Sequence, residues 1–165
     1  MAVSYGKKFE AQFKKDWVRT FPNSFIYRLP DQQSFYYGTS GNPCDFLCYN
    51  EGILFLLECK SFRGNTFPFS NLRQYSKLLL EKLKNVKGER VGVVLWFIDH
   101  STVAYCPITE IAKMVQDKKK SVNIKDVLEK TYNLIVLPGI LKRTFLDTDY
   151  SILMKLNDKE EMVNE

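Results

Sequence analysis

The chain has 165 residues, of which 45% are hydrophobic and 26% are charged, with a formal net charge of +5. This length and apolar content fit one compact domain that holds a core without disulfides, and they exclude collagenous, low-complexity and wholly disordered chains. The apolar runs are far shorter than the roughly 18 to 20 residues of a membrane span, so we expect no membrane contact.

The charge is spread unevenly along the chain. Residues 147–165 carry six acidic and two basic side chains, which gives −4, so residues 1–146 carry +9. A basic body suits a polyanionic partner such as nucleic acid, while a basic surface that binds nothing is the alternative interpretation. We predict a single domain over residues 1–156, followed by an acidic, disordered tail over residues 157–165.

The four cysteines and the single histidine limit the cellular compartment and the kinds of metal site that we expect. The cysteines lack paired CxxC spacing and no secretory leader begins the chain, so we expect a reducing, cytoplasmic location; a phage-encoded protein acting in the host cytoplasm is one option. One histidine excludes zinc sites that need several imidazoles. Metal chemistry would therefore use carboxylates, whose hard oxygens favour Mg²⁺, with Mn²⁺ as a substitute.

The first half of the chain predicts a helix followed by strands. Phe9, Phe13 and Trp17 recur every four residues and predict a helix over residues 6–20, before a strand over residues 24–29. Residues 30–43 are rich in Gln, Ser, Gly and Tyr and predict a loop.

The remaining elements follow the same alternation of helices and strands. We predict strands over 44–49 and 53–60, a helix over 71–85 capped by Ser70, a buried strand over 91–98, a strand over 101–106, a helix that starts at Pro107, a short helix beyond 123, and apolar runs over 134–137 and 152–156. The pattern indicates an α/β fold, a mixed central sheet flanked by helices.

Two carboxylates converge if the strands over 44–49 and 53–60 form a hairpin. With Glu51-Gly52 as a two-residue loop, Asp45 falls opposite Glu58; a three-residue loop with a bulge would shift this pairing by one step. Lys60 points to the same face as Glu58, because the two residues are two apart on one strand.

This arrangement is unfavourable for folding alone, because like charges opposite each other destabilise a sheet and buried carboxylates are costly to desolvate. A divalent cation would remove the conflict, and a neighbouring ammonium would orient an attacking water or stabilise phosphate charge. The alternative is structural: Asp45 as a polar turn residue, and Glu58 with Lys60 as a surface ion pair.

Three segments resemble motifs of known nucleases. Asp45, twelve further residues and then Glu58-Cys59-Lys60 resemble the PD-(D/E)xK nuclease signature. The segment Gly6-Lys7-Lys8-Phe9-Glu10 is similar to the helix motif of Holliday-junction resolvases of the RecU type, and Phe69-Ser70-Asn71-Leu72-Arg73-Gln74-Tyr75 resembles a later motif of the same family.

The resemblance implies a restriction-endonuclease-like core and an Mg²⁺-dependent endonuclease that cuts DNA four-way junctions symmetrically as a homodimer. It implies that Asp45 and Glu58 ligate the metal together with the Cys59 backbone carbonyl. Lys60 would position the nucleophilic water, Glu10 would add an outer carboxylate, and Gln74 would hold the site by hydrogen bonds. Glu10 could instead pair with Lys14 along its helix, and Gln74 could be a surface residue.

Basic and aromatic side chains are the candidates for contact with DNA. Cations would contact phosphates, and an aromatic triplet in the loop over 30–43 could stack on unpaired bases or simply pack in the loop. The candidates are Lys7, Lys8, Lys14, Lys15, Arg73, Lys77, Phe35, Tyr36 and Tyr37. The competing functions are a restriction-like or repair endonuclease of the same superfamily, an inactive nuclease-derived DNA-binding module, and a purely structural protein.

Overall fold

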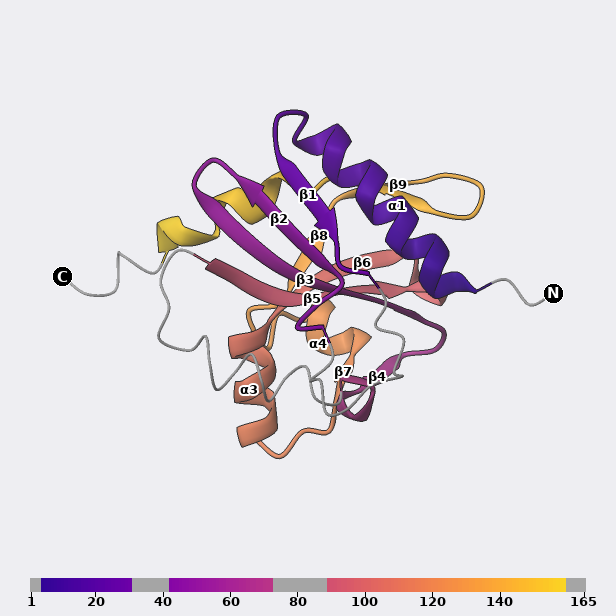
Figure 1. Ribbon diagram of the computed structural model, residues 1–165. Coiled ribbons are helices and arrows are strands. Elements are labelled where there is room, and N and C mark those ends of the chain that lie inside the picture. Colours follow the sequence, from indigo (N-terminus) through magenta and orange to yellow (C-terminus); the bar gives the residue numbers. More distant parts are fainter. Residues whose placement is uncertain (1–3, 31–41, 73–88, 160–165) are drawn as a thin grey trace, which may run out of the picture.

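The computed structural model describes residues 4–30, 42–72 and 89–159. A mixed six-stranded sheet with the order β1-β2-β3-β5-β6-β8 crosses its middle (Figure 1). The strands are β1 (Phe25–Arg28), β2 (Phe46–Asn50), β3 (Ile53–Phe62), β5 (Glu89–Phe97), β6 (Thr102–Pro107) and β8 (Ile135–Leu137). Strands β3 and β5 pair in parallel and the other neighbours are antiparallel, so the predicted mixed sheet is confirmed.

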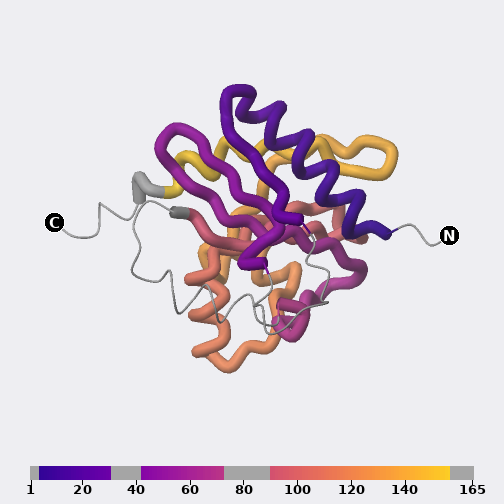
Figure 2. Tube along the Cα trace, viewed as in Figure 1, coloured from indigo at the N-terminus to yellow at the C-terminus, as the bar shows by residue number. Residues whose placement is uncertain are grey.

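Helices and two small hairpin-like sheets cover both faces of the central sheet (Figures 1 and 2). The helical elements are α1 (Tyr5–Thr20), η1 (Phe69–Leu72), η2 (Ile98–His100), α3 (Ile108–Gln116), α4 (Ile124–Leu128) and η3 (Ser151–Lys159). The small sheets pair β4 (Thr66–Pro68) with β7 (Ser121–Asn123), and β9 (Gly139–Leu141) with β10 (Leu146–Thr148). Helix α1, β10 and η3 lie on one face, and α3 and α4 lie on the other.

Helix α1 is held by its apolar stripe. Phe9, Phe13 and Trp17 are almost completely buried and pack on the face of β2 and β3 that presents Phe46 and Phe55. Ring centroids of Phe13 and Phe46 lie 4.8 Å apart, and those of Trp17 and Phe55 lie 5.1 Å apart. This packing fixes the rest of the helix, including its charged side chains, relative to the hairpin.

Strand β5 contributes side chains to two hydrophobic clusters, one on each face of the sheet. Every residue from Val91 to Phe97 is buried, as the continuous apolar run predicts. Alternate side chains enter opposite clusters, with Val93 and Leu95 beneath α3 and α4, and Val94 and Trp96 beneath α1. The strand therefore forms the centre of the fold, and β3 with its charged residues pairs directly against it.

Some elements differ from the expectations. Pro107 is the residue before α3 and not its first residue, and the apolar run over 152–156 forms the 3₁₀ helix η3. Strands β4, β7, β9 and β10 have three residues each, too few for the periodicity of apolar residues to reveal them. The predicted helix over 71–85 and the predicted loop over 30–43 lie mostly outside the described residues. In the described part of the chain no helix has the length and apolarity to cross a membrane.

Gly92 in β5 lies directly against the Tyr105 ring of β6. A Cβ on Gly92 would lie 2.4 Å from Cε2 of Tyr105 and 2.7 Å from the carbonyl oxygen of Cys106. The Tyr105 ring is buried and forms part of the core beneath α1, so it has little room to move. The position therefore requires a residue without a side chain.

We predict that Gly92→Ala lowers the free energy of unfolding by about 1–3 kcal/mol, because the added methyl overpacks the core. Urea unfolding followed by tryptophan fluorescence measures the change. Gly6→Ala is the control, because a Cβ on Gly6 in the exposed start of α1 meets nothing nearer than Ser4 Oγ at 4.0 Å. The control should be neutral or stabilising by up to about 1 kcal/mol, and equal effects of the two changes would contradict the prediction.

Candidate active site

A tight turn sets the register of the hairpin that β2 and β3 form. Glu51 and Gly52 have φ of 47° and 85°, the two positive values that a type I′ turn requires, and Asn50 pairs with Ile53. The two-residue loop is therefore confirmed and the bulged alternative is wrong. Counting along the ladder, Phe46 pairs with Leu57, which places Asp45 next to Glu58 as predicted.

Asp45 is fixed by backbone groups of both neighbouring strands. Its N–H donates to the carbonyl of Leu57 at 3.2 Å, and its carbonyl accepts from Leu29 N–H at 2.8 Å. Its side-chain Oδ2 accepts from the backbone N–H of Cys59 at 2.8 Å. The carboxylate is therefore tied to the strand segment that carries Glu58 and Lys60.

Glu58 and Lys60 form an ion pair on the same face of β3. The distance from Lys60 Nζ to Glu58 Oε1 is 2.7 Å, and the two side chains are 33% and 13% exposed, respectively. Burial lowers the pKa of Lys60, but the charge and hydrogen bond of Glu58 outweigh it, so the net shift is upward. Lys60 is therefore a protonated donor at neutral pH and not a base.

Asp45 sits in excess negative charge. Burial raises its pKa, repulsion from Glu58 adds to the shift, and the hydrogen bond from Cys59 only partly opposes it, which leaves the pKa at about 6. Glu10 contributes further repulsion. Glu58 and Glu10 therefore both repel the charged form of Asp45. A bound cation would reduce this repulsion.

Glu10, on α1, forms an ion pair with an arginine that the sequence analysis did not single out. Arg28, the last residue of β1, places its Nε 2.7 Å from Glu10 Oε2. In the described part of the chain this ion pair to Arg28 takes the place of the alternative pairing with Lys14. The signal in the sequence is weak, because eighteen residues separate the partners and nothing in their spacing links them.

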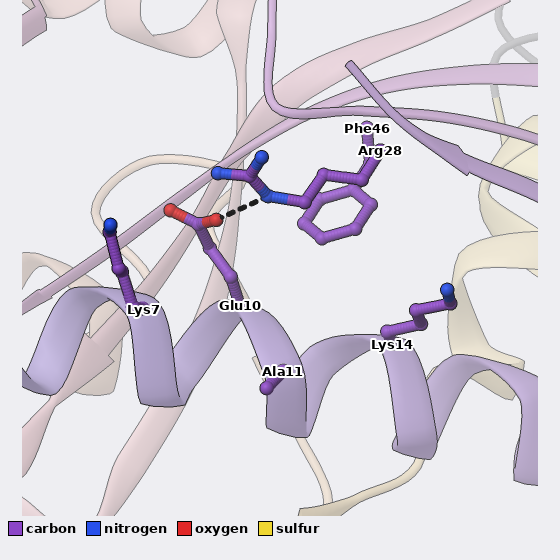
Figure 3. A pocket seen from close by; sticks show the side chains of 6 residues that line it. All are labelled: Lys7, Glu10, Ala11, Lys14, Arg28 and Phe46. Carbon is purple, nitrogen blue, oxygen red and sulfur yellow. Dashed lines mark hydrogen bonds and ion pairs between the residues drawn. The ribbon is translucent and has the colours of Figure 1, made fainter. Parts of the chain in front are cut away.

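A depression of about 370 Å³ lies between α1 and the edge of the hairpin, lined by Lys7, Glu10, Ala11, Lys14, Arg28 and Phe46. Figure 3 shows Glu10 and Arg28 facing each other across it, with Lys7 and Lys14 on the helix to either side. Two of the predicted DNA contacts thus share a hollow with the charged pair. Lys8 and Lys15 are also exposed on α1 but are not among the residues that line this hollow.

The ligand chemistry of Asp45 and Glu58 fits a hard divalent cation, because both offer carboxylate oxygens. Within residues 4–30, 42–72 and 89–159, no three His, Cys, Asp or Glu side chains gather in a way that could hold a metal ion. A cation at Asp45 and Glu58 would need its other ligands from backbone carbonyls and water. Gln74, Arg73, Lys77, Phe35, Tyr36 and Tyr37 lie outside the described residues.

Known proteins resemble this chain in sequence and in fold. No protein-family model matches it. Over 98 residues it is 29% identical to a protein named Holliday junction resolvase RecU from Mycoplasmopsis pulmonis, and the match covers 59% of this chain and 60% of the relative. The resemblance to RecU-type resolvases that the motifs indicated is confirmed by this match.

The solved structure of Hjc, a Holliday junction resolvase from the archaeal hyperthermophile Archaeoglobus fulgidus, matches with a TM-score of 0.50 at 16% identity. The match covers 72% of this chain and 88% of Hjc. The chain shares its fold with Hjc. The predicted restriction-endonuclease-like core, with its mixed sheet flanked by helices, is therefore confirmed.

We predict that the metal-free protein loses stability as the pH rises from about 4 to about 7. The folded pKa of Asp45 is raised, so its contribution is complete below the ordinary value of 3.8 and is lost as the pH passes about 6. In Asp45→Asn the amide oxygen can still accept from Cys59. The variant should reduce the change in the free energy of unfolding between about pH 4 and about pH 7 by on the order of 2 kcal/mol. Urea unfolding in chelator at the two pH values measures it; identical pH dependence of variant and wild type would contradict the assignment.

Proposed function

We propose that this protein is a divalent-metal-dependent DNA endonuclease that cuts four-way junctions. The observation that carries the proposal is the convergence of Asp45, Glu58 and Lys60 on the hairpin of a fold shared with Hjc, with the Lys60 ammonium 2.7 Å from Glu58. The name of the RecU relative supports a junction as the substrate.

Asp45 and Glu58 would hold the cation together with the backbone carbonyl of Cys59. Mg²⁺ is the proposed ion and Mn²⁺ would substitute for it, because both accept hard oxygen ligands. When bound, the cation supplies Lewis acidity toward the phosphoryl group. The hydrogen bond from Cys59 N–H would keep Asp45 in place before the ion arrives, since it needs no metal to form.

The remaining charged groups act around this centre. Lys60, protonated because Glu58 raises its pKa, would donate a hydrogen bond that orients the attacking water or stabilises charge on the phosphate. Glu10, held by Arg28, would add an outer carboxylate. Gln74 would support the site by hydrogen bonds, as the motif resemblance implies.

The scissile strand would approach along the hollow beside α1. Lys7, Lys14 and Arg28 bring three cations to its walls, and phosphate contacts of this kind give affinity without reading the base sequence. Lys8, Lys15, Arg73 and Lys77 would add further phosphate contacts, and Phe35, Tyr36 and Tyr37 would stack on unpaired bases at the junction centre.

A homodimer would supply the two symmetric cuts that resolution requires, because each chain contributes one such site and a two-fold axis relates two copies. An enzyme acting on cellular or phage DNA would work in the cytoplasm.

We predict that chelation, Asp45→Asn, Glu58→Gln and Lys60→Ala each abolish cleavage of a four-way junction. Mg²⁺ should raise the thermal midpoint of the wild type and of Lys60→Ala, because the ammonium is a neighbour of the ion and not a ligand. The two carboxylate variants should show little of this shift. Wild-type cleavage by Asp45→Asn would show that the assigned site is wrong.

We predict strong preference for a four-way junction over a flap, a linear duplex and single strands when equal concentrations are offered in Mg²⁺. Mapping the products to the nucleotide should show paired, symmetric incisions on strands of like polarity. Equal cleavage of duplex and junction would move the function to a restriction-like or repair nuclease, and binding without cleavage would indicate an inactive DNA-binding module.

A further inference from the structure

The β9–β10 hairpin presents an exposed surface that the candidate active site does not use. All three residues of β9 are exposed, including Ile140 at 67% and Leu141 at 62%, and the exposed cations Lys142 and Arg143 follow at the turn. In Figures 1 and 2 the orange hairpin extends past α1 on the side away from β1. A second charged surface is therefore available on this side of the helix.

The β9–β10 hairpin is anchored to the rest of the domain through Phe145, Leu146 and Thr148. Leu146 is buried in the core beneath α1, and the Phe145 ring lies 5.2 Å from the ring of Trp96. In the buried interface, the backbone N–H of Thr148 donates to Asp16 Oδ2 at 3.0 Å. The cations at the turn are therefore carried by an anchored element, which lowers the entropy cost of placing them on a ligand.

Two hydrogen bonds from α1 identify the side of the helix that faces this hairpin. Gln12 donates to Asp147 at 3.4 Å and Arg19 donates to the carbonyl of Thr148 at 3.0 Å, so both lie on the side toward β10. Lys8 and Lys15 are four residues before and three residues after Gln12, which places them on the same side of the helix. Lys7 and Lys14 line the hollow with Arg28 on the other side.

We define the hairpin surface as Lys8, Lys15, Lys142 and Arg143. The nearby acids are already engaged: Asp16 is buried with Arg19 Nη1 2.8 Å from its Oδ1, and Asp147 lies 3.8 Å from Arg19 and 3.9 Å from Lys142. Asp149 accepts from the backbone N–H of Ser151. Together with Arg19, the four cations of the surface outnumber these three acids, so the surface keeps a net positive charge, which suits a polyanion.

We propose that the hairpin surface binds the phosphate backbone of a second duplex arm of the junction, while the hollow beside Arg28 receives the arm that is cut. The inference rests on the proposed junction-cutting function. The two basic surfaces lie on different sides of α1, because Lys7 and Lys14 line the hollow whereas Gln12 and Arg19 face β10. In this proposal a straight duplex follows one side of the helix. A branched DNA offers two arms and engages both, which supplies a physical basis for preference for junctions.

The composition of the hairpin favours DNA over a protein partner. Strand β9 has only three residues and is followed by two cations, features that oppose strand addition by another chain. Ile140 and Leu141 beside those cations suit contact with the apolar sugar edges of a groove.

The test is the double variant Lys142→Ala/Arg143→Ala, with binding measured by fluorescence anisotropy in chelator so that no cleavage occurs. Affinity for a four-way junction should fall roughly tenfold and the slope of log affinity against log salt should fall by about two, because two phosphate contacts are lost. Affinity for a linear duplex of one arm's sequence should stay within about twofold.

Lys125→Ala/Lys130→Ala is the matched control. It removes the same charge from exposed residues in and after α4, on the opposite face of the sheet, and should leave both affinities unchanged. Equal losses on junction and duplex, or no loss on either, would overturn the two-surface proposal.

Ile140→Ser/Leu141→Ser distinguishes a protein interface. Conversion of a DNA-free dimer to a monomer by this variant, seen in sedimentation, would assign the hairpin to contact between copies and overturn the proposal. An unchanged oligomeric state with weaker junction binding would support it. Failure of the proposed function itself is separate, because it would appear as a wild type that neither prefers nor cuts junctions.

Discussion

The site depends on the pairing of β2 with β3, which the Glu51-Gly52 turn holds in one register. A slip of one residue would move every side chain of β3 to the opposite face, exchanging Leu57 and Cys59 in the core for Glu58 and Lys60. The buried stripe beneath α1 therefore enforces the same register as the turn. Two independent constraints, one local and one from packing, place Asp45 beside the charged end of β3.

Folding stability alone does not explain why charged residues occupy the site. Burial raises the pKa of Asp45 and repulsion from Glu58 raises it further, although the Cys59 amide and Lys60 partly compensate. The second ion pair, Glu10 with Arg28, adds a carboxylate from a separate element. Such an arrangement stores unfavourable charge in the free protein, and the affinity for a cation would draw on that stored energy.

Long, strongly patterned elements could be predicted from the sequence, and short or long-range features could not. The stripe of Phe9, Phe13 and Trp17 marks a helix by its period, and the continuous apolar run marks the buried strand β5. The hairpin composition placed Asp45 near Glu58 but left a shift of one step open, which the turn geometry decided. Strand β9 has no alternation to detect because all of its residues are exposed. The partner of Glu10 was missed because helical spacing suggested Lys14, whereas packing of α1 against the sheet brought Arg28 closer. Asp16 was not singled out in the sequence, because its partner Thr148 is far along the chain, and the structure buries it beside Phe13 and Trp17.

That separation bears on how the protein is made. The hydrogen bond between Asp16 and Thr148 spans 132 residues, so Oδ2 of Asp16 gains this partner only after Thr148 has left the ribosome. Gln12 and Arg19 bind the other oxygen of Asp16 from within the helix, but burying Oδ2 without its backbone donor is costly. Helix α1, with Glu10 and the lysines beside the hollow, thus has its full set of contacts only once the segment that carries Thr148 has packed against it. A chain that terminates before Thr148 would lack this stabilising contact and would hold α1 less firmly beside the hollow.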